Sequence, residues 1–281
     1  MLFRNKHFHR GFTVLELLIV IAIIGILSSF LFISYQGHRE KAKLSNTMQW
    51  AKSIHSELGA YAVGGWSFDV ISGNTVLDDS GNGNNGTIYG ATQVDGIIDK
   101  ALSFDGVDDY VLIPSIPNLK PSNITISLWV KTNEDTSVES WNGIILGAYG
   151  GGYSNGWRIL DHLNRPLFQM NFGDANPRSY YGDILGVGKW VHIVATYDHQ
   201  YMRLYQNGKQ VGTPLAETRD INWSASGDLR IGFAQSYFNG SIDDVRIYKE
   251  PFTQAQIQQL YAQGLKIHQN LAKLEKSENL P

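Results

Sequence analysis

The stretch Trp190-Val191-His192-Ile193-Val194-Ala195-Thr196-Tyr197 is largely apolar on both of its alternating faces. Because successive side chains of a strand point to opposite faces, a strand with this pattern is buried on both sides. We therefore predict a central strand here. Around it, from Trp66 onward, short apolar alternations are separated by Gly, Asn and Asp clusters about every ten residues, which is typical of an all-β sandwich.

The connection between two of these alternations is specific. Asn207-Gly208 lies between Leu204-Tyr205 and Val211, and Asn-Gly is a strong signal for a two-residue hairpin turn. Taken together, the alternations predict strands at Trp66–Ile71, Thr87–Tyr89, Ala101–Phe104, Tyr110–Ile113, Ile124–Thr132, Gly143–Ala148, Trp157–Leu160, Leu167–Phe172, Trp190–Tyr197, Met202–Gln206, Leu229–Ile231 and Ile242–Tyr248.

Composition sets limits on the kind of protein. The chain has 281 residues, 43% of them hydrophobic, and a formal net charge of -3, which gives no reason to expect a nucleic-acid partner. It contains no cysteine, which excludes a disulfide framework, a thiol nucleophile and thiolate metal sites. The fold must therefore be stabilised by its core, by a metal bound through oxygen or nitrogen, or by both.

The N-terminus has a different character. An apolar run extends from Phe12 to about Ile33 and contains a single carboxylate, Glu16. A run of this length can just cross a bilayer with a hydrocarbon core of about 30 Å, in which a charge is costly and usually functional. Basic residues crowd positions 4–10 before the run. By the positive-inside rule this end stays in the cytoplasm and the bulk of the chain is exported.

Gly11, Phe12 and Glu16 carry a family resemblance. A glycine, an aromatic residue and a glutamate a little over one helical turn later resemble the prepilin cleavage signal of type IV pilins and type II secretion pseudopilins. The resemblance implies that a prepilin peptidase cleaves between Gly11 and Phe12 and methylates the new amino terminus at Phe12. It also implies that Glu16 pairs with that amino group in a neighbouring subunit. The alternative is an uncleaved single-pass anchor.

Helical periodicity continues beyond the apolar run. Leu44, Met48, Ala51 and Leu58 recur at three- and four-residue steps, and no proline interrupts the chain before Tyr61. We predict one long helix whose first part crosses the membrane. The predicted organisation is a leader at 1–11, the helix at 12–61 with its transmembrane part at 12–33, a linker at 62–65, the sandwich at 66–262 and a polar tail at 263–281. We interpret the tail as a frayed helical extension; the alternative is a partner-binding segment.

A second resemblance rests on a series of short motifs in the sandwich region. In their order along the chain they look like a laminin-G-like domain of the concanavalin A-like lectin/glucanase superfamily. The resemblance covers about 66–262, includes a closing helix at Thr253–Gln263, and implies a jelly roll of two antiparallel sheets. The motifs are Gly65–Asp69, Asp79–Gly86, Ala101–Val111, Ile126–Lys131, Lys189–Asp198, Leu204–Gly208 and Asn239–Tyr248.

One loop and one strand suggest a calcium site. The loop 78–86 is dense in the oxygen donors that calcium prefers. Asp243 shares the parity of Val245 and Ile247, so we expect it to point toward the core, where a carboxylate needs a cation or several donors. Laminin-G-like domains often hold a calcium ion that ties the first loops to the last strand. The resemblance thus implies a structural Ca2+ with the ligands Asp79, Asn82, Asn84 and Asp243, and Asp69 and Asp105 in reserve; the alternative is Asx-turns and caps without metal.

Aromatic residues in predicted loops are candidates for ligand binding. An exposed aromatic face can bind the apolar side of a sugar ring, with neighbouring Asn and Asp taking the hydroxyls. The alternative is local packing under long loops, whereas Trp66, Phe68, Phe104, Trp129 and Trp190 lie in predicted strands and are expected in the core. The loop candidates are Tyr149, Tyr153, Trp157, Tyr181, Trp223 and Tyr237.

The sequence gives no catalytic constellation. Glucanases of the superfamily carry alternating acids on one strand in a Glu-x-Asp-x-x-Glu-like pattern, whereas Asp243 and Asp244 are adjacent and so face opposite sides. His192 has no nucleophile motif near it in sequence and is predicted to be a core histidine. We therefore expect a protein that is not an enzyme.

Three functions fit these predictions. The first is a minor pilin in the inner membrane that joins a type IV pilus-type filament and displays an adhesive head for a glycan or an extracellular protein. The second is a type II secretion pseudopilin, and the third is a membrane-tethered lectin-like protein that does not assemble. The expected partners are other pilin or pseudopilin subunits, the prepilin peptidase and the inner-membrane assembly machinery.

Overall fold

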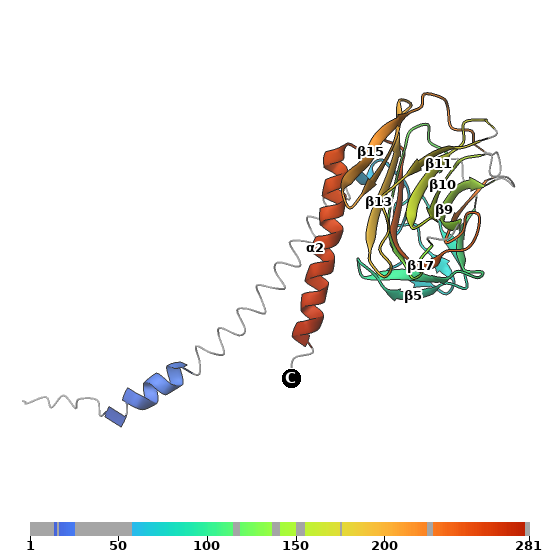
Figure 1. Cartoon of the computed structure of the whole chain (residues 1–281). Coiled ribbons are helices and arrows are strands. Elements are labelled where there is room, and N and C mark those ends of the chain that lie inside the picture. The colour runs from blue at the N-terminus through green and yellow to red at the C-terminus, as the bar shows by residue number, and fades with distance from the viewer. Residues whose placement is uncertain are drawn as a thin grey trace, which may run out of the picture. The chain divides into compact units, whose positions relative to one another are not determined.

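The computed structural model describes residues 14–15, 17–25, 58–114, 119–136, 141–149, 155–174, 176–223 and 227–278 (Figure 1). The chain divides into two compact units, residues 1–50 and 51–281. In the first unit, residues 14–15 and 17–25 are helical and their large apolar side chains are exposed. Most of the predicted helix, including Phe12, Glu16 and residues 26–57, lies outside the described residues, as does Gly11; of its last residues, 58–59 are helical and 60–61 form a turn. Among the described helices, none combines the length and apolar character needed to cross a membrane.

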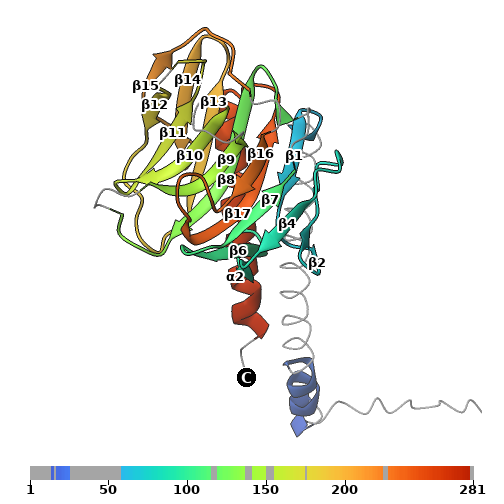
Figure 2. The same cartoon turned by 90° about the vertical axis from the view of Figure 1, so that its right-hand side faces the viewer.

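The second unit is a sandwich of two antiparallel sheets, which Figures 1 and 2 show from two sides. The eight-stranded sheet has the order β15 (Lys209–Ala216), β14 (Tyr201–Gln206), β13 (Val191–Tyr197), β8 (Ile124–Thr132), β17 (Asn239–Tyr248), β6 (Lys100–Asp105) and β5 (Thr92–Asp95), and β1 (Ala62–Trp66) also pairs with β17. The nine-stranded sheet has the order β12 (Arg178–Tyr181), β11 (Arg165–Met170), β10 (Trp157–His162), β9 (Asn142–Tyr149), β16 (Asp228–Ile231), β7 (Tyr110–Ile113), β4 (Gly86–Tyr89), β3 (Thr75–Val76) and β2 (Ile71–Ser72).

The core fills the space between the sheets. Alternate residues of β8, from Ile124 to Val130, belong to it, as do Trp66, Phe68 and Phe104. The predicted central strand is confirmed, since β13 lies between β14 and β8 and all seven of its residues are buried. Its odd-numbered residues face the core, whereas Val194 faces the other side.

A helix covers the outer face of the eight-stranded sheet. α2 (Gln254–Glu278) packs Ile257 and Leu260 on Val194, and Leu58 joins the same apolar cluster (Figure 1). The helix approaches the sheet closely at Gly264, where a Cβ atom would lie 2.7 Å from the indole of Trp129. At 1.5 Å per residue its 25 residues span about 37 Å. α2 thus contains both the predicted closing helix and most of the predicted tail.

Two local predictions have opposite outcomes. The hairpin at Asn207-Gly208 is confirmed, because β14 and β15 flank it and both residues have the positive φ of a type I′ turn, 49° and 75°. Residues 62–65 were expected to be a linker but belong to β1, which pairs with β17. Glycine permits this strand because a Cβ at Gly65 would lie 2.5 Å from Asp79 Oδ1.

Candidate functional site

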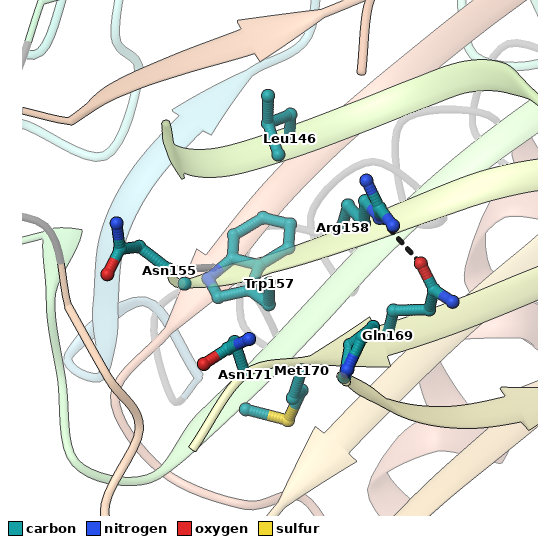
Figure 3. A pocket seen from close by; sticks show the side chains of 9 residues that line it. Leu146, Asn155, Trp157, Arg158, Gln169, Met170 and Asn171 are labelled. Atoms are coloured by element: carbon teal, nitrogen blue, oxygen red, sulfur yellow. Dashed lines mark hydrogen bonds between the residues drawn. The ribbon is translucent and has the colours of Figure 1, made fainter. Parts of the chain in front are cut away.

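A pocket lies at the first residues of β10 in the nine-stranded sheet (Figure 3). Its cavity volume is about 10 Å³, roughly the space of one water molecule. β9, β10 and β11 supply most of its walls, and the segments before β10 and after β11 supply the rest. The lining residues are Leu146, Asn155, Gly156, Trp157, Arg158, Gln169, Met170, Asn171 and Pro177.

Arg158 is positioned by strand register. It lies directly opposite Leu146 of β9 and Gln169 of β11, so the three side chains share the outer face of the sheet. Arg158 Nε donates to Gln169 Oε1 at 2.6 Å, the bond drawn in Figure 3, and Gln169 Nε2 donates to Ser179 Oγ at 2.9 Å. Arg158 is only 8% exposed. Its guanidinium is therefore held in a fixed orientation by a chain of hydrogen bonds across three strands.

Trp157 lies on the opposite face of β10. It is 1% exposed and belongs to the core between the sheets, and a Cβ at Gly147 would lie 2.3 Å from its indole. Figure 3 shows the indole with Leu146 on one side and Met170 on the other. Its Nε1 is buried and has no hydrogen-bond partner among the described residues. A buried donor without a partner is costly, and this one lies in the core between the sheets, away from any ligand surface.

Two asparagines complete the polar lining. Asn155 Oδ1 accepts from Asn222 Nδ2 at 2.9 Å, and Asn171 Oδ1 accepts from the Gly173 N–H at 2.8 Å. Asn171 Nδ2 reaches the Asp174 carbonyl at 3.3 Å. The lining is therefore divided between the two faces of the sheet, with Arg158 and Leu146 on the outer face and Trp157 and Met170 in the core.

The predicted aromatic ligand residues do not form one group in the described part of the chain. Trp157 lines the pocket, but as a buried strand residue and not as the exposed loop residue that was expected. Tyr181 ends β12 and is 43% exposed, Trp223 packs against the core, and Tyr237 lies beside Phe233 with 4.9 Å between ring centroids. Tyr149 ends β9, and Tyr153 lies outside the described residues.

Sequence reasoning missed Arg158 and Gln169, which are the polar residues of two predicted strands. The signal was present, because each is a polar residue flanked by apolar residues in an alternating strand. Their partnership depends on the pairing of β10 with β11, which a composition argument does not reveal.

Three of the predicted calcium ligands belong to the loop before β4. Asp79 faces Arg246, with Oδ1 at 3.1 Å from Nη1. Asn82 Nδ2 donates to the Ala62 carbonyl at 3.0 Å and Asn84 Nδ2 to the Val63 carbonyl at 2.5 Å. These contacts tie the loop to β1, and the charge of Asp79 already has a cationic neighbour.

Asp243 occupies a separate environment. A bulge with Asp244 at φ 45° shifts the register of β17, so Asp243 lies opposite Trp129 on the outer face of the sheet. The expectation that it shares the face of Val245 is wrong because the bulge adds a residue. Asp243 is nevertheless fully buried, and its Oδ2 accepts the N–H groups of Ile97 and Ile98 at 2.8 and 2.9 Å.

Only one oxygen of the Asp243 carboxyl is hydrogen-bonded within the described part of the chain. Oδ1 is buried and has no hydrogen-bond partner among the described residues, and burial raises the pKa of Asp243 to about 8. Asp69 adds a like charge nearby, and burial raises its pKa to about 6. Ionising two buried carboxyl groups is costly, and a divalent cation bound between them would stabilise their charged forms.

A third acidic group lies at Asp105, Asp108 and Asp109. One oxygen or more from each lies within 4.8 Å of the others, which is close enough to hold a metal ion. Asp105 Oδ1 also accepts the Val107 N–H at 2.8 Å, and Asp109 Oδ2 accepts the Asp105 N–H at 2.9 Å. Only Asp105 was among the predicted ligands, although the motif Asp105-Gly106-Val107-Asp108-Asp109 contains the whole group.

His192 is buried, as predicted for a core histidine. It packs on Trp129 with 4.8 Å between ring centroids, and burial lowers its pKa to about 4. Its Nε2 lies 2.9 Å from Ser127 Oγ, a contact that the sequence did not suggest. Both side chains are buried on the face that α2 covers, so this Ser–His pair does not meet a substrate surface.

Comparison with known families agrees with the two layers of antiparallel strands. A family model described as the concanavalin A-like lectin/glucanases superfamily matches residues 105–258, which is more than half of the chain. The chain belongs to this superfamily. A second model, for the prokaryotic N-terminal methylation motif, matches residues 6–32. This concanavalin A-like protein thus carries a type IV pilin N-terminal motif on the same chain.

Curated relatives match different parts of this concanavalin A-like protein. Fimbrial protein EcpC of Eikenella corrodens is 29% identical over 104 residues, which are 36% of this chain and 68% of EcpC. A fimbrial protein of Moraxella nonliquefaciens is 31% identical over 96 residues, which are 29% of this chain and 62% of that protein. Mouse pappalysin-1 is 35% identical over 75 residues, 25% of this chain, but the match spans only 5% of pappalysin-1.

Solved structures share the fold. The binding domain of Paraclostridial Mosquitocidal Protein 1 superposes with a TM-score of 0.60 at 16% identity, covering 73% of this chain and 52% of that one. Domain 4 of AbnA, an extracellular arabinanase from Geobacillus stearothermophilus determined with arabinotriose, gives 0.55 at 21% identity and covers 71% and 98%. At these identities the likeness concerns the concanavalin A-like sandwich alone.

Proposed function

We propose that this protein is a minor subunit of a type IV pilus-type filament that displays a concanavalin A-like recognition head. The observation that carries the proposal is the presence of the methylation motif at 6–32 and the sandwich on one chain. The two fimbrial relatives support the assembly part of the proposal. A sandwich of this size is bulky for dense helical packing, which favours a minor over a major subunit.

The N-terminal residues would govern processing and assembly. The prepilin peptidase cleaves between Gly11 and Phe12 and methylates the Phe12 amino group, and the segment 12–33 anchors the protein in the inner membrane with the head exported. On assembly, Glu16 pairs with the Phe12 amino group of a neighbouring subunit. The pair neutralises two charges that would otherwise be isolated in an apolar filament core.

A Glu16→Ala variant tests the assembly step. We expect the variant to reach the membrane at the normal level and to be missing from sheared filaments, because nothing would neutralise the Phe12 amino group. Glu40→Ala is the matched control, since Glu40 lies outside the apolar run. Incorporation of the Glu16→Ala variant would refute the mechanism. Wild-type protein found only in the membrane would favour a tethered lectin, and a secretion defect on deletion would favour a pseudopilin.

The head would recognise a ligand and would not catalyse a reaction. Among the described residues that line the pocket of Figure 3, none is acidic, whereas a glycosidase needs two carboxylates across its cleft. AbnA domain 4, whose fold is similar, was determined with arabinotriose. These points support a carbohydrate as ligand, with an extracellular protein as the alternative.

A structural calcium would belong at Asp243 with Asp69. The buried Asp243 Oδ1 lacks a partner among the described residues, whereas Asp79 already faces Arg246. Asp79, Asn82 and Asn84 therefore serve, in this proposal, to fix the neighbouring loop to β1. Calorimetric melting with and without a calcium chelator tests the proposal, and an unchanged melting temperature would refute it.

A further inference from the structure

Asp161, near the end of β10, is a buried acid to which no role has been assigned above. Its side chain is 0% exposed, and its Oδ1 accepts the hydroxyl of Thr136 at 2.8 Å. Its Oδ2 is also buried and has no hydrogen-bond partner among the described residues. A carboxylate oxygen closed off from solvent without a partner is costly, so this group needs a proton, a water molecule or a cation.

The strand places Asp161 between the two sheets. Trp157 and Ile159, two and four residues before it on β10, belong to the core, so Asp161 shares their face. Thr132, at the end of β8 in the other sheet, is buried as well, and its hydroxyl is close enough to lower the pKa of Asp161. The acid therefore lies where the segment 132–136, which follows β8, meets the end of β10.

A second carboxylate acts on Asp161. Burial raises the pKa of Asp161 to about 6, and the negative charge of Glu134 adds to the shift. Glu134 is held by two amides, with Asn142 Nδ2 at 2.8 Å from Oε1 and Asn239 Nδ2 at 3.2 Å from Oε2. No described lysine or arginine forms an ion pair with either acid. A divalent cation would stabilise both negative charges.

Not all of the close oxygen pairs around Asp161 share a proton. Thr136 Oγ1 lies 2.8 Å from Asp161 Oδ1 and 3.0 Å from Asn164 Oδ1. A hydroxyl has one proton, so it can donate to only one of these two acceptors. The Asn164 amide cannot be turned to supply the other proton, because its Nδ2 donates to Asp135 and its Oδ1 accepts the Thr136 N–H. Acceptor oxygens are thus held side by side, as they are around a calcium ion.

We propose that a calcium ion binds beside Asp161, with Asp161, Thr136 and Asn164 as ligands and with Glu134 balancing its second charge. Asn164 belongs to the hairpin between β10 and β11, and Thr136 to the segment after β8. The ion therefore fastens the eight-stranded sheet to the nine-stranded sheet at this end of the sandwich. It is distinct from the calcium proposed at Asp243.

Titration calorimetry with calcium chloride on chelator-treated, full-length protein in detergent tests the site. We expect Asp161→Asn to remove one bound calcium from the wild type, and also from Asp243→Asn, which lacks the other proposed site. Magnesium chloride should bind here about tenfold more weakly, because magnesium demands a stricter geometry and gives up its water reluctantly. An unchanged number of calcium ions in Asp161→Asn would overturn the inference. Magnesium binding of equal strength would overturn the assignment to calcium.

Two variants complete the test of the residue. Thr136→Val keeps the acid but removes a ligand, so its calcium affinity should fall by about tenfold; it serves if Asp161→Asn does not fold, and an unchanged affinity would overturn the inference. Asp183→Asn is the matched control, since Asp183 is an exposed acid and should keep every calcium ion. Melting curves establish that each variant is folded.

The pH dependence distinguishes the two calcium proposals. The pKa of Asp161 is raised by burial to about 6, and the charged groups that act on it are Glu134 and His162. Its carboxylate is therefore formed by about pH 7, whereas Asp243, with a pKa raised by burial to about 8, still titrates above that pH. Between pH 7 and 8, the calcium-induced rise in melting temperature should stay level in Asp243→Asn and should grow in Asp161→Asn. No calcium-induced rise in folded Asp243→Asn would overturn the inference.

Discussion

The two sheets share one core but differ on their outer faces. On the eight-stranded sheet, α2 covers Trp129 and His192, which stack with Tyr261 of the helix. On the nine-stranded sheet, Arg158 and Gln169 line a pocket at the first residues of β10. Both faces bury polar side chains, but the first encloses them under a helix, whereas no described helix covers the second, which we call the open face.

The difference lies in how each face is stabilised. A covered face loses its water and gains apolar contact area, so its side chains contribute strongly to the free energy of unfolding. On the open face, Arg158, Gln169 and Ser179 are joined by hydrogen bonds, each of which contributes about 1 kcal/mol. Substitutions on the two faces should therefore differ in the size of their effect on stability.

The largest effect should come from the covered face. Trp129→Ala removes a nearly fully buried indole that contacts α2 at Gly264. Truncation of a buried tryptophan costs about 3–5 kcal/mol, because the site cannot collapse fully around the cavity. Denaturant unfolding measures the loss. Tyr181→Ala, on the exposed aromatic of the other sheet, is the control and should cost less than about 1 kcal/mol. Equal losses would contradict the division of roles.

The alternation of apolar and polar residues was enough to predict a sandwich of two sheets, but not the strand β1 or the bulge in β17. The pattern of Trp190–Tyr197 gave a strand buried on both faces, and Asn207-Gly208 gave the hairpin, because both signals are local. β1 was missed because Gly64-Gly65 is read as a break, although here glycine permits close contact with the next loop. The bulge at Asp244 was missed because a single residue of positive φ leaves no periodic trace.

The pocket was only partly predictable for a similar reason. Trp157 was singled out as an aromatic residue, but its burial depends on Gly147 of the neighbouring strand. Arg158 and Gln169 become partners through pairing of β10 and β11, and Leu146 joins them from β9. Long-range register, and not residue type, creates the site.

The next effect should come from Asp243, a buried acid on the covered sheet. Its pKa, raised by burial to about 8, means that the folded protein keeps a proton that the unfolded chain releases above about pH 4. Stability from this group is therefore present at low pH and is lost as pH rises toward 8. Between pH 7 and 8, the melting temperature of chelated protein should fall, and Asp243→Asn should flatten that fall. In this range His192, with its pKa lowered by burial to about 4, stays neutral in the folded protein.

Adding calcium extends the pH test of Asp243. Binding requires the carboxylate form, so stabilisation by added calcium should grow as pH rises, and Asp243→Asn should abolish that growth. Asp105→Asn is the matched control, because Asp105 belongs to the separate acidic group with Asp108 and Asp109. If Asp105→Asn abolishes the calcium effect and Asp243→Asn does not, the cation belongs to the Asp105 group.

The smallest effect should come from the open face. Gln169→Ala removes the acceptor that orients Arg158 but leaves its charge. A hydrogen bond of this kind is worth about 1 kcal/mol, so the free energy of unfolding should fall by about that amount. Denaturant unfolding measures the loss.

Two further variants test whether the hydrogen bonds account for this effect. Ser179→Ala removes only the bond from Gln169 Nε2 and should reduce the free energy of unfolding less than Gln169→Ala does. Gln210→Ala, on an exposed edge strand, should leave stability unchanged. If Gln169→Ala costs as much as Trp129→Ala, side chains on the open face act through packing, as they do on the covered face.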